Sequence, residues 1–193
     1  MVKVASVILE KSNMGVKILF TGAQGTGKTS VMEALPDLLP KLKGITRTCI
    51  KEKNLAINEE SNDVSQCAIF DAYERQLTAD NSFISERSLV DVVSFTTHQY
   101  YQHKCSGKVL TDQLNRLFDF IKQNPNAIHV YFPIEFDPVE DGTRSTDKEY
   151  QHSIDKIIYD TLKGCGANFI TVHGTVEERV KHVTNLIKSC LAD

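Results

Sequence analysis

The sequence lacks the long hydrophobic runs and leader features of membrane and secreted proteins. Its early apolar stretch, Val4–Leu9, is far shorter than the roughly 20 residues that a membrane-spanning helix needs. No convincing signal-peptide cleavage site follows that stretch. We therefore expect neither a secretory leader nor a membrane partner.

Paired cysteines and a strong excess of one charge are also missing. The five cysteines are scattered, without a CxxC pair or a Cys/His cluster of zinc-site spacing. This usage is typical of a reducing, cytoplasmic location. The net charge of −3 gives no sign of broad adhesion to nucleic acid, although it leaves room for a local basic groove. With 193 residues and no internal repeat, the chain suits one α/β domain.

One motif dominates what is present. A β-prone run ending at Thr21 leads directly into the pattern Gly, four residues, Gly-Lys-Thr, and a helix-like segment follows. Glycines in such a loop let successive backbone N–H groups surround a phosphate, and the helix dipole adds positive charge. We expect Lys28 to reach the β- and γ-phosphates of ATP and the Thr29 hydroxyl to ligate Mg²⁺. The predicted nucleotide-binding residues are Gly22, Ala23, Gln24, Gly25, Thr26, Gly27, Lys28, Thr29 and Ser30.

Strand-like and helix-like segments alternate along the chain. Short β-branched or apolar runs predict strands, and residues with helical spacing fill the intervals. The predicted strands are Val16–Thr21, Ile45–Ile50, Ser82–Ser85, Ala127–Phe132 and Asn168–Val172. Ser61 and Asp63 are N-cap candidates for the helix that runs to Leu77. This alternation predicts a parallel sheet of about five strands, covered by helices on both faces.

Ligands of such sheets bind at the carboxyl ends of the strands. Glu86 and Arg87 directly follow a buried strand, so Glu86 would accept a proton or orient Mg²⁺, and Arg87 would neutralise phosphoryl charge. Asp91 lies one helical turn further, where it would contact a sugar hydroxyl or simply pair with Arg87. Arg47 is a candidate for the acceptor's phosphate or base, and equally for a solvated surface cation.

Two later loops complete the predicted site. The polar segment near 134–147 contains Asp141-Gly142-Thr143-Arg144, and Gly142 would let Arg144 close over the ATP phosphates as an arginine finger. An ordinary turn with an exposed Arg144 is the alternative. Gly174 follows the last strand, where an adenine ring would lie against backbone.

These motifs resemble those of the small P-loop kinases of the nucleoside and nucleotide kinase group. The similarity is greatest to AAA-type kinase domains, which include nicotinamide riboside kinase domains and many phage-type kinases. It rests on residues 22–29, Glu86-Arg87-Ser88 with Asp91, Asp141–Arg144 and Val172–Gly174 with Glu178-Arg179. The resemblance implies a three-layer P-loop kinase sandwich with a mobile lid, spanning residues 14–193 after an N-terminal extension of residues 1–13. The single lid arginine departs from deoxynucleoside kinases, whose lids usually carry several.

Three functions remain open on the sequence alone. The leading hypothesis is transfer of the γ-phosphoryl group of ATP to a nucleoside or nucleoside monophosphate, with Mg²⁺. A kinase acting on hydroxymethylated pyrimidine within DNA would need a basic channel, for which Lys104, Lys108 and Arg116 are sparse. A nucleotide-sensing regulator would bind ATP without transfer, and Glu86-Arg87 argues against it. The sequence leaves the oligomeric state open.

Overall fold

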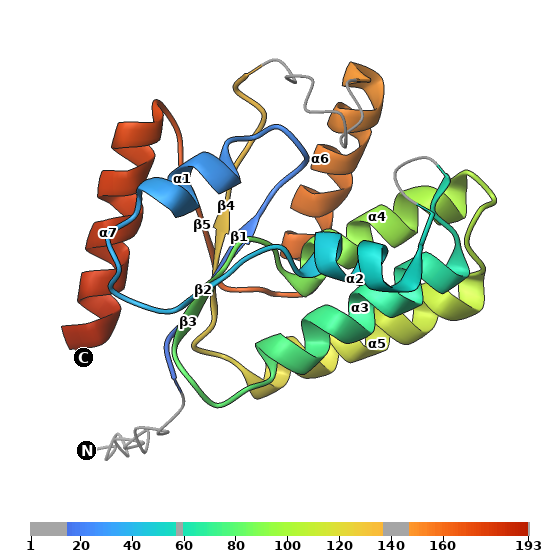
Figure 1. The fold of residues 1–193 in the computed structure, drawn as a ribbon, viewed down its shortest axis with the longest axis horizontal. Helices are drawn as coiled ribbons and strands as arrows, with labels where there is room; N and C mark the ends of the chain where they lie inside the picture. The colour runs from blue at the N-terminus through green and yellow to red at the C-terminus, as the bar shows by residue number, and fades with distance from the viewer. Residues whose placement is uncertain (1–14, 57–59, 137–146, 193) are drawn as a thin grey trace, which may run out of the picture.

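The computed structural model describes residues 15–56, 60–136 and 147–192, which form five strands and seven helices. One or two helices follow each strand, so strands and helices are interspersed along the chain as the sequence predicts (Figure 1). Their bounds are β1 Lys17–Thr21, α1 Lys28–Ala34, β2 Lys41–Leu42, α2 Ile45–Lys53, α3 Asp63–Leu77, β3 Phe83–Ser85, α4 Leu89–Tyr101, α5 Gly107–Gln123, β4 Ile128–Tyr131, α6 Lys148–Gly164, β5 Phe169–Thr171 and α7 Val176–Ala192.

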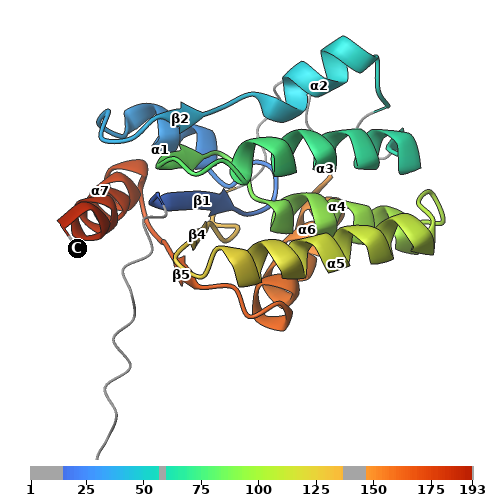
Figure 2. The same ribbon diagram turned by 90° about the horizontal axis from the view of Figure 1, so that it is seen from below.

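The strands form one sheet in the order β2-β3-β1-β4-β5, and every neighbouring pair is parallel. Helices α1 and α7 cover one face, while α3, α4, α5 and α6 lie on the other, with α2 packed on α3 (Figures 1 and 2). The expected three-layer sandwich around a parallel five-stranded sheet is confirmed. Because all strands are parallel, their carboxyl ends meet at one edge of the sheet.

Two hydrophobic clusters hold the layers together, one on each face. Alternate residues of β1 divide between them, since successive side chains of a strand point to opposite faces. Ile18 and Phe20 pack with Val31 of α1 and Val183 of α7, whereas Leu19 faces the cluster of α3–α6. The central strand is therefore buried on both sides, which fixes the position of the loop that follows Thr21.

The strand predicted at Ile45–Ile50 is wrong, because these residues form helix α2. The β-branched residues favour a strand locally, but Ile45 and Cys49 stand four apart and are both buried against α3. The Cys49 thiol donates to the carbonyl of Ala68 at 3.4 Å. Tertiary packing of one helical face thus overrides the local preference, and β2 comes earlier, at Lys41–Leu42.

The N-cap of α3 is Asn62, between the two predicted candidates Ser61 and Asp63. Its side chain accepts hydrogen bonds from the backbone of Val64 (3.1 Å) and Ser65 (3.2 Å). The Ser65 hydroxyl accepts in return from the Asn62 backbone N–H at 2.8 Å, which completes a capping box.

Some predictions lie outside the described residues: the extension 1–13, most of the lid segment, and Arg144 within it. Within the part of the chain that the structure describes, no helix is long and apolar enough to cross a bilayer.

Candidate active site

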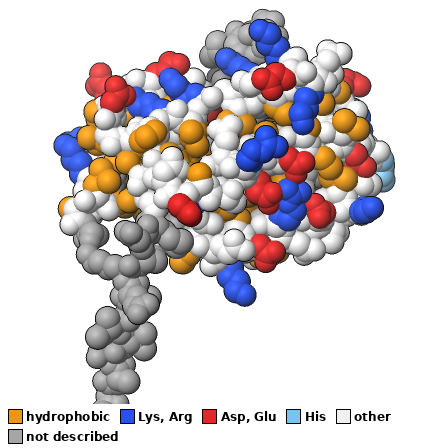
Figure 3. Space-filling model, turned by 60° about the horizontal axis from the view of Figure 1, so that its bottom comes forward, with side chains coloured by type: hydrophobic (Ala, Val, Ile, Leu, Met, Phe, Trp, Pro, Cys, Tyr) orange, Lys and Arg blue, Asp and Glu red, His pale blue; other side chains and the backbone are white. Residues whose placement is uncertain are grey.

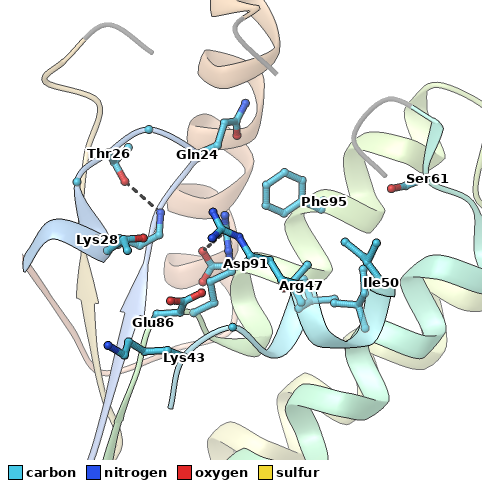
Figure 4. A pocket seen from close by; sticks show the side chains of 18 of the residues that line it. Gln24, Thr26, Lys28, Lys43, Arg47, Ile50, Ser61, Glu86, Asp91 and Phe95 are labelled. Atoms are coloured by element: carbon cyan, nitrogen blue, oxygen red, sulfur yellow. Dashed lines mark hydrogen bonds and ion pairs between the residues drawn. The ribbon is translucent and has the colours of Figure 1, made fainter. Parts of the chain in front are cut away.

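The loop between β1 and α1 folds back around the ammonium group of Lys28. Lys28 is 6% exposed. Its Nζ donates to the carbonyls of Gly22 (2.6 Å) and Ala23 (2.5 Å) and to the Thr26 hydroxyl (3.1 Å). The charge that would meet a phosphate is therefore held by the loop's own oxygens. Figure 4 shows the contact with the Thr26 hydroxyl. A bound phosphate would replace these acceptors with stronger, charged ones.

Two glycines of the loop cannot easily be replaced by another residue. At one a side chain would clash, and at the other the backbone conformation favours glycine. A Cβ at Gly22 would lie 2.5 Å from the carbonyl oxygen of Phe132. Gly27, the N-cap of α1, has φ 84°, in the left-handed region that favours glycine. These constraints explain why the motif needs glycine where the chain leaves β1 and where it enters α1.

Two buried side chains from distant helices hold the loop by its carbonyl groups. Gln151 of α6 is 1% exposed, and its Nε2 donates to the carbonyl of Gln24 at 2.7 Å. Arg179 of α7 is likewise 1% exposed, and its Nη1 donates to the carbonyl of Thr26 at 2.7 Å. With these carbonyls bonded outward, the loop is held in one conformation from both sides of the sheet.

Arg179 is itself fixed by Glu135, which follows β4. Glu135 Oε2 accepts from Arg179 at 2.5 Å and from the backbone N–H of Gly174 at 2.9 Å, and Oε1 lies 2.5 Å from His173 Nδ1. Burial acts to raise the pKa of Glu135, but these hydrogen bonds outweigh it and lower the pKa to about 2. The Arg179 guanidinium also lies 5.6 Å from the centre of the Phe132 ring. Glu135 therefore joins the phosphate loop to the turn after β5.

The kinase resemblance includes Arg179 without giving it a role, and sequence reasoning does not name Gln151, although a signal was present for both. Arg179 stands four residues before Val183 and eight before Ile187, so a cation occupies the apolar stripe of α7. Gln151 similarly precedes Ile154 in the buried stripe of α6. A polar residue inside an apolar stripe must find a buried partner, but the sequence does not say which one.

Asp91 is fully buried at the start of α4 and accepts hydrogen bonds from several donors. Its Oδ1 accepts from the Gly22 backbone N–H at 3.1 Å and from Arg87 Nη1 at 3.3 Å. Its Oδ2 accepts from the Ser88 backbone N–H (3.0 Å) and hydroxyl (2.8 Å). The sequence offered two roles for Asp91, contact with a sugar hydroxyl and pairing with Arg87. The structure contains the pairing with Arg87. Asp91 also ties the phosphate loop to the segment after β3.

Glu86 and Arg87 both leave the sheet edge toward the same space. Glu86 is half-buried, and its carboxylate forms no hydrogen bond or ion pair with the residues that the structure describes. Figure 4 shows this carboxylate between the side chains of Lys28 and Lys43. The Arg87 guanidinium stacks 5.4 Å from the centre of the Phe95 ring.

These elements enclose a cavity of about 630 Å³. The phosphate loop lies at one end and helices α2, α3 and α4 line the other (Figure 4). The lining residues are Gln24, Gly25, Thr26, Gly27, Lys28, Thr29, Glu33, Lys43, Gly44, Thr46, Arg47, Ile50, Lys51, Ser61, Gln66, Ile69, Glu86, Arg87, Asp91, Val92, Phe95 and Tyr150. A volume of this size is typical of a small-molecule site.

The cavity brings together most of the predicted site residues. Arg47 reaches it from α2, although that segment is a helix and not the expected strand. Gly22 and Ala23 are buried at the start of the loop and do not line the cavity, and Ser30 is exposed on α1. Gly174 is placed beside Glu135, away from the cavity lining.

The parallel sheet, its strand order and the phosphate-binding loop define a P-loop domain with a kinase-like α/β fold. A family model described as AAA domain matches residues 17–179. The chain therefore belongs to this AAA domain family, and the predicted resemblance to AAA-type P-loop kinases is confirmed. No curated protein sequence matches the chain.

Solved structures share the fold at low sequence identity. Deoxyadenosine kinase from M. mycoides, with the products dCMP and dCDP bound, is 18% identical over 91% of this chain and 100% of that one, with a TM-score of 0.65. NadR in complex with NR is 15% identical over 91% of this chain, with a TM-score of 0.66. The match covers 51% of the NadR chain, so this domain spans about half of that protein.

Proposed function

We propose that this protein transfers the γ-phosphoryl group of ATP to a nucleoside or a nucleoside monophosphate. The observation that carries the proposal is the single cavity in which the phosphate loop faces Glu86 and Arg87. A donor site and an acceptor site must share one space for in-line transfer. The fold supports the proposal, since structures with the same fold include deoxyadenosine kinase with bound dATP and NadR with NAD and AMP-PNP.

The cationic residues of the site would bind the phosphate groups, and its oxygen-bearing residues would bind Mg²⁺. Lys28 would leave the carbonyls of Gly22 and Ala23 and contact the β- and γ-phosphates, and Arg87 would neutralise charge on the transferring group. Thr29 and Glu86 line the cavity with oxygen donors, which suit Mg²⁺, and bound Mg²⁺ would neutralise phosphate charge. Arg144 stays a predicted arginine finger, outside the described residues.

The far end of the cavity suits the nucleoside part of the acceptor. Ile50, Ile69 and Val92 give it apolar walls, and the Phe95 ring offers a surface on which a base would stack. The carboxamide of Gln66 lies at the same end, and its Oε1 accepts a hydrogen bond from the Thr96 hydroxyl at 3.1 Å. Apolar walls with few fixed polar groups are typical of small-molecule sites.

No specific observation favours the DNA-directed alternative. On the face shown in Figure 3, the described Lys and Arg side chains are interspersed with Asp and Glu. Arg116, one of the few candidates for DNA contact, is engaged by the carboxylates of Asp71, Glu74 and Asp112. Binding to DNA would need a continuous basic surface instead.

An acceptor screen tests the proposal. ADP release is measured with ATP and Mg²⁺, alone and with each of the common nucleosides and nucleoside monophosphates. Release that depends on the acceptor, with the phosphorylated product identified by chromatography, is the expected result. ATP binding without turnover for any acceptor would instead support the nucleotide-sensing regulator and overturn the kinase.

A further inference from the structure

Cationic side chains gather on the α2 side of the cavity. Lys43, Arg47 and Lys51 follow one another at four-residue spacing, and all three line the cavity. Lys43 directly precedes the N-cap Gly44, and the other two lie within α2, where this spacing places them on one helical face. We call these three residues the α2 cation stripe (Figure 4 labels Lys43 and Arg47).

The phosphates of ATP do not account for this stripe. The phosphate loop supplies its own backbone N–H groups, the start of α1 and Lys28. The stripe instead comes from a separate element, because α2 follows β2 in the chain and packs on α3. A second anion in the cavity would use it.

The described residues that line the cavity include more cations than carboxylates: Lys28, Lys43, Arg47, Lys51 and Arg87 are the cations. The described acidic residues that line the cavity are Glu33, Glu86 and Asp91. Asp91 is buried and accepts hydrogen bonds from Gly22, Ser88 and Arg87. Lys43 and Lys51 form no ion pair with the part of the chain that the structure describes. The acceptor end therefore carries a surplus of positive charge.

Arg87 adds a further cation to the same space. One of its nitrogens donates to Asp91 at 3.3 Å, its guanidinium stacks on Phe95, and its side chain is 20% exposed. A guanidinium has five N–H donors, so Arg87 can bind Asp91 and a phosphate together. Arginines and lysines that line one cavity in this way are typical of phosphate binding.

We infer that the acceptor is a nucleoside 5′-monophosphate, whose phosphate lies between Arg87 and the α2 cation stripe. The inference rests on the proposed phosphotransferase function and narrows its substrate class. An oxygen of the acceptor phosphate forms a bond to the γ-phosphorus of ATP as the bond from that phosphorus to the β–γ bridging oxygen breaks. The products are a nucleoside diphosphate and ADP.

This acceptor needs no base to remove a proton from the attacking oxygen. A phosphate monoester has a second pKa of about 6, so the attacking oxygen is already ionised at neutral pH. No proton has to be removed from it, and the unpaired carboxylate of Glu86 then serves to orient Mg²⁺ rather than to act as a base. With a neutral nucleoside, the hydroxyl proton would have to be taken up.

The experiment compares matched acceptors and matched variants. ADP release is measured with each nucleoside 5′-monophosphate and with the corresponding nucleoside, for the wild type, Arg47→Ala and Lys53→Ala. Lys53 lies on the same helix but is absent from the cavity lining, so Lys53→Ala is the control for a lost cation on α2. Arg47→Lys tests whether charge at this position restores activity.

We expect turnover with monophosphates and a loss of about 10- to 100-fold in kcat/KM for Arg47→Ala, carried mainly by KM. Lys53→Ala should match the wild type, Arg47→Lys should recover part of the loss, and the ATP affinity of Arg47→Ala should be unchanged. Turnover with nucleosides but not with monophosphates would overturn the inference and leave the proposed phosphotransferase standing. Absence of turnover with every acceptor would overturn both.

Discussion

The Nη1 atom of Arg179 lies 2.7 Å from the carbonyl oxygen of Thr26, although 153 residues separate them in the chain. This hydrogen bond connects the last helix to the phosphate-binding loop. Glu135 holds the other end of the same guanidinium. The conformation of the loop therefore depends on a buried ion pair that no local motif contains.

Arg179→Met should weaken ATP binding and destabilise the fold. The substitution leaves Glu135 without its cation and the Thr26 carbonyl without its donor. Breaking a buried ion pair lowers the free energy of unfolding by about 3 kcal/mol or more. We expect the lower figure here, because Glu135 is partly exposed. Thermal unfolding and ATP titration measure the two effects. Arg75→Met, at an exposed position of α3, is the control. Unchanged ATP affinity in a folded Arg179→Met protein would contradict the idea that Arg179 holds the phosphate-binding loop in its binding conformation.

His129 should make the protein sensitive to mild acid. The ring is fully buried in β4, and burial lowers its pKa to about 4 despite the opposing effects of the Asp91 charge and of a backbone hydrogen bond with Asn168. The unfolded chain binds a proton on His129 below about pH 6.5 and the folded chain does not. Stability is therefore fully present above pH 6.5 and is lost as the pH falls toward 4, by up to roughly 3 kcal/mol.

Denaturant unfolding at pH 7 and pH 4.5 tests this for the wild type and His129→Leu. The variant has no proton to bind at this position, so it should lose less stability than the wild type over the same interval. It should also fold well at pH 7, because it replaces a buried polar ring with an apolar side chain. Equal losses for the two proteins would show that His129 does not titrate as described.

Glu86→Gln should slow phosphoryl transfer without weakening the fold. Because the Glu86 carboxylate is unpaired among the described residues, its loss removes no described contact. Transfer should fall by about 100-fold, whether the carboxylate accepts a proton or orients Mg²⁺. Steady-state ADP release gives the rate, and ATP titration should show an affinity close to that of the wild type. Full activity in the variant would exclude a role for the Glu86 carboxylate in phosphoryl transfer.

Asp91→Asn should be costly although the side chain keeps its shape. An amide group places an N–H₂ donor where Gly22, Arg87 and Ser88 already direct donors toward the carboxylate. We expect a loss of about 2–3 kcal/mol in the free energy of unfolding, as for hydrogen bonds to a charged group. Denaturant titration measures it, with Asp119→Asn at an exposed position of α5 as control. Identical midpoints for Asp91→Asn and the wild type would exclude this structural role.

The limits of sequence reasoning are clearest at α2. The run Ile45–Ile50 reads as a strand by composition, and only its packing on α3 makes it a helix. That correction also changes the cavity, because a helix rises only about 1.5 Å per residue and a strand about 3.3 Å. The helix therefore brings Arg47 and Lys51 much closer together along the cavity wall than a strand would. The grouping of these cations along one wall of the cavity thus became visible only with the tertiary structure.

The sequence by itself determined the phosphate-binding loop, the alternation of strands and helices, and the placement of Glu86 and Arg87 after a buried strand. These follow from local patterns, in which glycine conformation, hydrophobic periodicity and short spacing carry the signal. The tertiary structure alone decided the partners of Arg179, Gln151 and Asp91. Those contacts join segments far apart in the chain, and a buried polar group reveals that it needs a partner but not which one.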